Sequence, residues 1–222
     1  CFTLCFYYIS NCTFRFYPLS GCGKTTILKI ILGIDTEFEG EVLLDDKAIT
    51  EPDLNRGMVF QDNRLLPWMT VYENVAFALP AEIGKVEKNE KTNNIIKLVG
   101  LSGFEKVYPR QLSGGMAQRV AIARAIINMP DVLLLDEAFG SLDDFTRGKM
   151  QLELQKIVVQ SHATTIMVTH NIDEAILLSN KIIVMGEKPA SINDLIYVDM
   201  PYPRDKRSDH FVLYRNRLIT EL

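Results

Sequence analysis

The sequence of 222 residues predicts an α/β fold with a mostly parallel central sheet. From about residue 19 onwards, short apolar runs alternate with amphipathic segments, as in repeated strand–helix units. The run VLLLD at residues 132–136 is almost entirely apolar, which is typical of a strand covered on both faces of its sheet. A glycine-containing turn, SGCGKTT at residues 20–26, leads directly into a helical pattern.

The individual elements follow from local patterns. The first helix is predicted from Lys24 to near Gly33, because a glycine after the last periodic residue is a helix-stop signal. Apolar residues at helical spacing predict further helices over 87–99, 116–128, 145–159 and 172–179. Short apolar runs predict strands over 40–46, 56–62, 132–136, 164–170 and 181–185. The segment 101–111 is predicted to be a loop.

Composition narrows the class of protein. A net charge of −4 argues against a nucleic-acid partner, since such surfaces are normally basic. The apolar runs are strand-sized and far shorter than the roughly 20 residues that cross a bilayer. The cysteines lack the paired spacing of a zinc site, so we expect reduced thiols in a cytosolic protein. Because the first residue is Cys rather than Met, we expect a fragment, a processed product or a misassigned gene start.

The glycine-containing turn predicts a nucleotide site. Its backbone N–H groups can surround phosphate oxygens, and the helix that follows directs its positive amino end at the same anion. Lys24 would reach the β- and γ-phosphates, and the Thr25 hydroxyl would bind Mg²⁺. The alternative is an ordinary strand-to-helix turn, because Pro18 stands where the pattern G-x-x-x-x-G-K-[ST] has its first glycine. The predicted nucleotide-binding residues are Ser20, Gly21, Cys22, Gly23, Lys24, Thr25 and Thr26.

Two carboxylates follow the buried strand at 132–136. Asp136 would hold Mg²⁺ through water, and Glu137 would polarise the water that attacks the nucleotide. The alternative is an acidic first turn of the next helix, which is common for an isolated Asp-Glu pair. The upstream GKT turn on the same predicted sheet favours the catalytic interpretation.

A second open helix start lies at Ser113, Gly114 and Gly115. Taken alone, it could be a serine N-cap followed by glycines. One ATP does not need two anion cradles from one small domain, however. We therefore expect this cradle to bind the γ-phosphate of an ATP held by a second copy, in a head-to-tail pair with two ATPs between the chains.

Together these stretches resemble the ATP-binding subunit of ABC transporters over roughly residues 19–222. The segments that carry this resemblance are LSGGMAQR, LLLDEAFGSLD and the later VTH. Within that family the chain looks most similar to the ATPases of nitrate, sulfonate and taurine importers. That narrower similarity lies in MVFQDNRLLPWMTVYENVAFAL, LDEAFGSLDDFTR, VTHNIDEAILLS and PYPRDKRSDHFVLYRNRL.

The resemblance implies a P-loop NTPase fold and further site residues. Gln61 matches the glutamine that senses Mg²⁺ and the γ-phosphate, although it could simply be an exposed polar residue at a strand end. Asp143 matches the aspartate that crosses the dimer interface, and His170 matches the histidine that contacts the γ-phosphate. The segment LLPWMT would help form the groove for a permease helix, with a buried loop anchor as the equal alternative for Trp68.

The domain organisation that the resemblance implies includes a helical subdomain inserted at about 62–128 and a truncated N-terminal antiparallel β-subdomain. Residues 1–18 do not resemble the family, and we hypothesise that they are foreign sequence preceding an ATPase domain at 19–222. Pro18 would weaken nucleotide binding by at most about ten- to hundredfold, from roughly 1–3 kcal/mol of backbone strain. Ala138 replaces a proline that is usual in the family, a change we expect to be tolerated.

The resemblance further implies ATP and Mg²⁺ as cofactors and a homodimer, or a pair with a second ABC ATPase. Permease subunits would be direct partners and a solute-binding protein an indirect one, at the cytoplasmic face of the membrane. The expected function is ATP hydrolysis that energises uptake of a small anion. The alternatives are a catalytically impaired remnant and, less favoured, a soluble ABC-type ATPase acting on nucleic acid or ribosomes.

Overall fold

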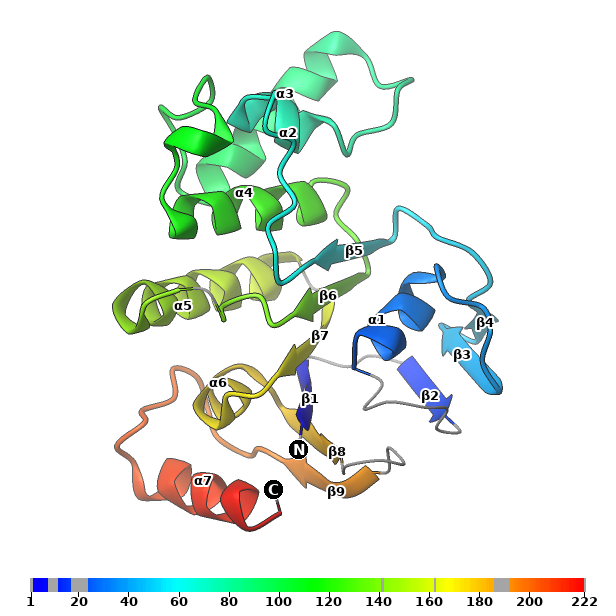
Figure 1. Ribbon diagram of the computed structural model, residues 1–222, viewed down its shortest axis with the longest axis vertical. Helices are drawn as coiled ribbons and strands as arrows, with labels where there is room; N and C mark the ends of the chain where they lie inside the picture. The colour runs from blue at the N-terminus through cyan, green and yellow to red at the C-terminus, as the bar shows by residue number, and fades with distance from the viewer. Residues whose placement is uncertain are drawn as a thin grey trace. The chain divides into compact units, whose positions relative to one another are not determined.

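A computed structural model describes residues 2–7, 12–16, 24–140, 142–161, 163–185 and 192–221 (Figure 1). The chain divides into two compact units. The first comprises Cys1–Asp53, Leu134–Glu137 and Thr164–Leu222, and the second comprises Leu54–Leu133 and Ala138–Ala163. No helix within the described ranges combines the length and the apolar character needed to cross a membrane.

The first unit is built on strands in the order β6-β7-β1-β8-β9, of which β6 contributes its last three residues. β1 is antiparallel to both of its neighbours, with Leu4 opposite Val168 of β7 and opposite Ile183 of β8. It follows that β7 and β8 run in the same direction. The strand bounds are β6 (Val132–Asp136), β7 (Thr164–Thr169), β1 (Phe2–Tyr7), β8 (Lys181–Met185) and β9 (Ile192–Tyr197).

A second, antiparallel sheet in this unit has the order β2-β3-β4. It comprises β2 (Cys12–Phe16), β3 (Gly40–Leu44) and β4 (Lys47–Ala48). Phe14 lies opposite Val42, and Leu43 lies opposite Ala48. The helices of the first unit are α1 (Lys24–Leu32), α6 (Ile172–Leu178) and α7 (Asp209–Glu221).

Helix α1 ends where the sequence predicted. Gly33 follows it with φ of 80°, and its N–H donates to the Ile30 carbonyl oxygen at 2.9 Å. A β-carbon at Gly33 would stand 2.3 Å from the carbonyl oxygen of Glu51. Both the positive φ and the close backbone approach therefore require glycine here.

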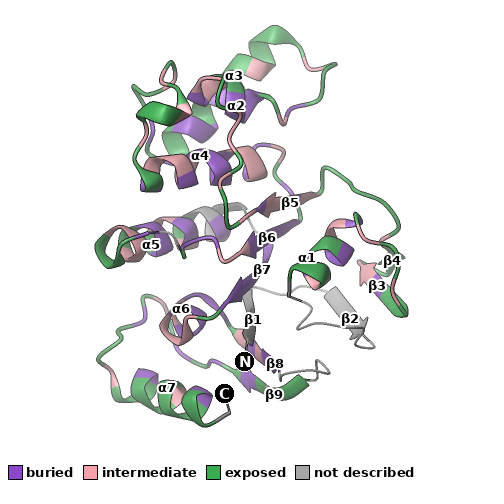
Figure 2. Ribbon diagram, viewed as in Figure 1, coloured by how far each residue is buried: buried purple, intermediate pink, exposed green. Residues whose placement is uncertain are grey.

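The core of the sheet is apolar on both faces. Leu133, Leu134 and Leu135 of β6 are completely buried, and every residue of β7 is buried as well (Figure 2). Helix α6 packs against β1 and β7, and α7 packs against α6. The sequence prediction of a strand covered on both faces at 132–136 is confirmed.

The second unit contains β5 (Arg56–Val59) and a set of helices packed around α4 (Gly114–Ile126). β5 approaches α4 closely, since a β-carbon at Gly57 would stand 2.3 Å from the carbonyl oxygen of Ala125. The N–H of Val132 donates to the carbonyl oxygen of Asn55 at 3.1 Å. The other elements are α2 (Val71–Ala76), α3 (Lys85–Leu98), the 3-10 helix η1 (Pro109–Gln111) and α5 (Asp144–Ser161).

Candidate functional site

The ends of β6 and β7 bring an acid and a histidine together. Glu137 follows β6, His170 follows β7, and His170 Nδ1 lies 3.4 Å from Glu137 Oε2. The backbone N–H of Glu137 donates to the Val168 carbonyl oxygen at 3.0 Å. Because the carboxyl ends of these neighbouring strands share one edge, β6 and β7 are parallel there, as the sequence predicted.

The backbone turns sharply at Glu137. Its φ of 44° lies in the left-handed region, which costs roughly 1 kcal/mol or more for a residue other than glycine. Its side chain is 16% exposed, whereas that of His170 is 60% exposed. The site therefore has a sheltered carboxylate next to an accessible imidazole, which is suitable for activating a water molecule.

Thr25 and Asp136 form a second contact at this edge of the first unit. The Thr25 hydroxyl, in the first turn of α1, donates to Asp136 Oδ2 at 3.2 Å. Hydroxyl and carboxylate oxygens are ligands that Mg²⁺ prefers, so these two residues fit such an ion. No cluster of three or more His, Cys, Asp or Glu suited to a metal occurs in the described ranges. Phosphate oxygens and water would have to complete the coordination.

The predicted second anion cradle is a capped helix start. Ser113 is the N-cap of α4, and its Oγ accepts from the Met116 N–H at 3.3 Å. This bond uses the Met116 N–H, so the N–H groups of Gly114 and Gly115 are the ones that would face a bound anion. Ser113 and Gly114 are exposed, whereas Gly115 is buried. The helix start can therefore present backbone donors to an anion.

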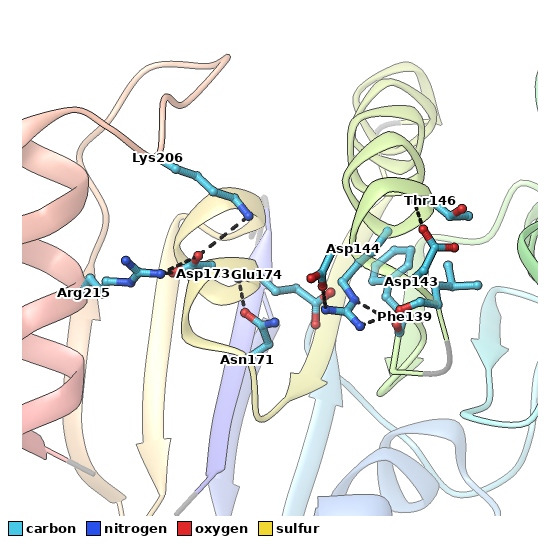
Figure 3. Close-up of polar contacts among 11 residues, drawn as sticks. Phe139, Asp143, Asp144, Thr146, Asn171, Asp173, Glu174, Lys206 and Arg215 are labelled. Carbon is cyan, nitrogen blue, oxygen red and sulfur yellow. Dashed lines mark hydrogen bonds and ion pairs between the residues drawn. The ribbon is translucent and has the colours of Figure 1, made fainter.

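Asp143 caps the following helix, α5. Its Oδ1 accepts from the Thr146 N–H at 3.0 Å (Figure 3). Hydrogen bonds from the Thr146 side chain and backbone hold the pKa of this exposed carboxyl below its ordinary value. The loop before it is anchored by Arg147, which donates to the carbonyl oxygens of Phe139 at 3.2 Å and Leu142 at 2.6 Å. The turn that carries Asp143 is thus held in a defined conformation.

The other residues that the sequence analysis discussed are placed as follows. Gln61, just after β5, and Thr26 are both exposed. Trp68 is 69% exposed, so its interpretation as a buried loop anchor is wrong. Lys24 begins α1. Pro18, Ser20, Gly21, Cys22 and Gly23 lie outside the described residues.

Sequence reasoning did not single out Thr169, which precedes His170, or Glu174, which lies in the first turn of α6. Glu174 is only 4% exposed and accepts a hydrogen bond from the Thr169 hydroxyl. The signal available in the sequence was the spacing of Asn171 and Glu174, which is typical of a helix-capping pair.

The fold and these contacts define an α/β nucleotide hydrolase of the P-loop class, with acid and histidine at the strand ends and a Ser-Gly-Gly helix start. The chain belongs to the ABC transporter family, whose sequence profile matches residues 19–140.

Three similar proteins support this assignment. The aliphatic sulfonates import ATP-binding protein SsuB of Bacillus cereus (strain ATCC 10987 / NRS 248) is 50% identical over 202 residues, 91% of this chain and 80% of that protein. The dimeric ATP-binding cassette MJ0796, solved with ADP and Pi, is 26% identical with a TM-score of 0.68, covering 89% of this chain and all of the other. CbiO1 of Clostridium perfringens, part of the ABC transporter complex cbiONQ, is 27% identical with a TM-score of 0.73, covering 90% and 81%. The predicted fold class, family and ATPase class are confirmed.

Proposed function

We propose that this chain binds and hydrolyses ATP to energise uptake of a small anion of the sulfonate type through a partner permease. The sulfonate class comes from the 50% identity to a sulfonate importer's ATP-binding protein. The partnership follows from the same similarity, since a chain of this family supplies energy and another subunit would select the solute. We place the chain at the cytoplasmic face of the membrane, with a solute-binding protein as an indirect partner.

One observation carries the proposal: Glu137 and His170 lie 3.4 Å apart at the strand edge. In the same unit, Thr25 contacts Asp136 at 3.2 Å, one residue before Glu137. The proposed water activator, γ-phosphate contact and magnesium ligands would therefore act together at one edge of the sheet in the first unit. Phosphoryl transfer is catalysed mainly by holding the reacting groups in position, which requires such residues to lie together.

Each residue has a proposed role in this reaction. The residues Ser20–Thr26, which include Lys24, bind the phosphates. Glu137 orients and polarises the attacking water. His170 contacts the γ-phosphate, and Gln61 links the nucleotide state to the permease. Thr25 and Asp136 would hold Mg²⁺, which would supply positive charge to offset the negative charge of the phosphates.

A pair of chains completes the proposed site. Ser113, Gly114 and Gly115 of one chain would bind the γ-phosphate held by the other, and Asp143 would cross between them. The solved dimer of MJ0796 supports a dimeric arrangement for this chain. The backbone amides of a capped helix start are suited to this role because they bind an anion without a side-chain rearrangement.

A second candidate is a catalytically impaired form of the same ATPase, and the direction of β1 favours it. In P-loop proteins a strand runs directly into the phosphate loop at the carboxyl edge of the sheet. Here β1 runs the opposite way, with Thr3 opposite Thr169 and Tyr7 opposite Thr165. The last described strand before Lys24 is β2, which belongs to the antiparallel sheet. We infer that a chain whose β1 runs in this direction would bind ATP less tightly than one with the usual strand direction.

Trapping the ATP-bound pair distinguishes the two candidates. Glu137→Gln removes the water activator while preserving shape, so an active ATPase would accumulate a dimer at millimolar ATP. We expect size-exclusion chromatography with light scattering to show twice the monomer mass with ATP and the monomer mass without it. Gly114→Asp, which places an anion in the cradle, is the matched control and should prevent dimerisation. A Glu137→Gln chain that stays monomeric at millimolar ATP, together with a wild-type chain that hydrolyses none, supports the impaired form.

A further inference from the structure

Three hydrogen bonds surround the backbone of His170. The Thr169 hydroxyl donates to Glu174 Oε2, and the same Thr169 Oγ1 accepts from the Asn171 N–H at 3.0 Å. Asn171 Oδ1 in turn accepts from the Glu174 N–H at 3.1 Å (Figure 3). Both chain neighbours of His170 are therefore tied to one residue in the first turn of α6.

The Glu174 carboxylate, which takes part in these hydrogen bonds, belongs to a buried residue. Glu174 is 4% exposed and Thr169 is 2% exposed, while the His170 side chain is 60% exposed. A buried carboxylate needs hydrogen-bond donors, because burying an ionised group without them costs far more free energy than burying a neutral polar group. The Thr169 hydroxyl is one such donor and can hold only one orientation while it both donates to Glu174 and accepts from Asn171.

We propose that Thr169 and Glu174 are positioning residues, which orient His170 toward Glu137 and the γ-phosphate by fixing the peptide N–H that follows the histidine and the threonine side chain that precedes it. This inference rests on the proposed function of His170. The hydroxyl of Thr169 fixes the Asn171 N–H, and the Glu174 carboxylate fixes that hydroxyl. Without these three hydrogen bonds, the exposed His170 imidazole would sample orientations in which its Nδ1 no longer lies 3.4 Å from Glu137 Oε2.

Thr169 is the better position for a test, because Glu174 also takes part in other interactions. Thr169→Val keeps the shape and removes the hydroxyl, and Thr169→Ser restores the hydroxyl. Thr165→Val is the matched control. Thr165 is a buried threonine of the same strand, and its hydroxyl has no hydrogen-bond partner in the described part of the chain.

In steady-state ATP hydrolysis we expect Thr169→Val to lower kcat about tenfold while KM for ATP stays within about twofold, since orientation and not binding is lost. Thr169→Ser and Thr165→Val should stay within about twofold of wild type. In a His170→Ala background, Thr169→Val should cause less than about twofold further loss, because the residue acts through the histidine. Equal losses with and without His170, or no loss in Thr169→Val, would overturn the proposal.

Imidazole NMR tests the same inference without any hydrolysis. The chain has three histidines, and His170→Ala identifies the His170 signals. Thr169→Val should shift these signals and leave those of His210 in place, and Glu174→Gln, which keeps an acceptor oxygen, should shift them less in the same direction. Unchanged His170 signals in both variants would overturn the inference. If wild type hydrolyses no ATP while the two variants shift the His170 signals, only the proposed function is contradicted.

Discussion

The side-chain methyl of Thr146 occupies the space that a β-carbon on Gly115 would need. The built β-carbon stands 2.7 Å from Thr146 Cγ2, closer than real β-carbons come to another atom. Gly115 belongs to the start of α4, and the Thr146 N–H is the donor that holds Asp143. The anion cradle and the Asp143 turn are therefore in direct contact within the second unit.

We expect Gly115→Ala to destabilise the chain by about 1–3 kcal/mol, because the added methyl overpacks this contact. Thr146→Ser removes the clashing methyl and keeps the backbone N–H, so the double variant should recover most of the loss. Gly114→Ala is the control: its nearest neighbour is Leu142 Cδ2 at 3.8 Å, and helix propensity should make it neutral or slightly stabilising. Urea unfolding of the four variants measures the coupling, and strictly additive losses would contradict it.

Arg119 joins α4 to α5 and to the end of α3. Its guanidinium lies 2.9 Å from Glu153 Oε2 and donates to the Met150 sulfur at 3.1 Å and the Val99 carbonyl oxygen at 3.4 Å. Because the pair is partly buried, we expect Arg119→Ala to lower the free energy of unfolding by about 1–3 kcal/mol. Glu153→Gln keeps an acceptor and should cost less. Denaturant unfolding measures the free energy of unfolding of both variants. Equal losses of stability would contradict the expectation that Arg119 stabilises the chain through several contacts at once.

Arg204 stabilises the carboxyl end of α6. The buried guanidinium donates to the carbonyl oxygens of Ile176, Ser179, Met200 and Val198, the last at 3.2 Å. We expect Arg204→Met to cost about 2–4 kcal/mol, since several buried carbonyl groups lose a charged donor together.

Arg207→Met is the control for that variant. The Arg207 side chain is 91% exposed, so its removal should change stability by less than about 0.5 kcal/mol. Thermal unfolding followed by circular dichroism compares the two, and similar melting temperatures would contradict the role of Arg204.

The capping box of α2 predicts a pH dependence. The Thr70 backbone N–H, followed by its hydroxyl, donates to Glu73 and holds the pKa of that carboxyl below its ordinary value of 4.5. A lowered folded-state pKa adds stability above the unfolded pKa and loses it as the pH falls through the folded one. Wild type should therefore exceed Glu73→Gln in stability at pH 7, and this difference should shrink below pH 4.5. Urea unfolding from pH 7 to 3 measures it, and a constant difference would contradict the ionised cap.

Much of the fold was predictable because its signals are local. The apolar runs that became β6 and β7 are buried, and the helix from Lys24 ended at a glycine with positive φ. Helix α4 begins two residues earlier than the predicted 116 because Ser113 caps it. Helices α2 and α7 were not predicted; α2 is short and depends on the capping box of Thr70 and Glu73.

Some contacts of the candidate site also involve residues that were selected from sequence, although their roles remain a proposal. Glu137, His170, Thr25 and Asp136 were selected from sequence, and the structure places them in two contacts of one unit. The exposure of Trp68 and the antiparallel direction of β1 were not predictable, because both depend on how distant segments pack. Thr169 was missed since a buried hydroxyl has no distinctive pattern in sequence.

The sequence by itself determined the family, the parallel placement of the acid and histidine at strand ends, and the open helix start at Ser113, Gly114 and Gly115. Those features depend on periodicity and on residue types at fixed short spacings. Only the tertiary structure decided that Thr146 excludes a side chain at Gly115 and that the Thr169 hydroxyl donates to the buried Glu174 carboxylate. The physical reason is that such contacts depend on distances between packed side chains and on burial, which residue spacing along the chain does not specify.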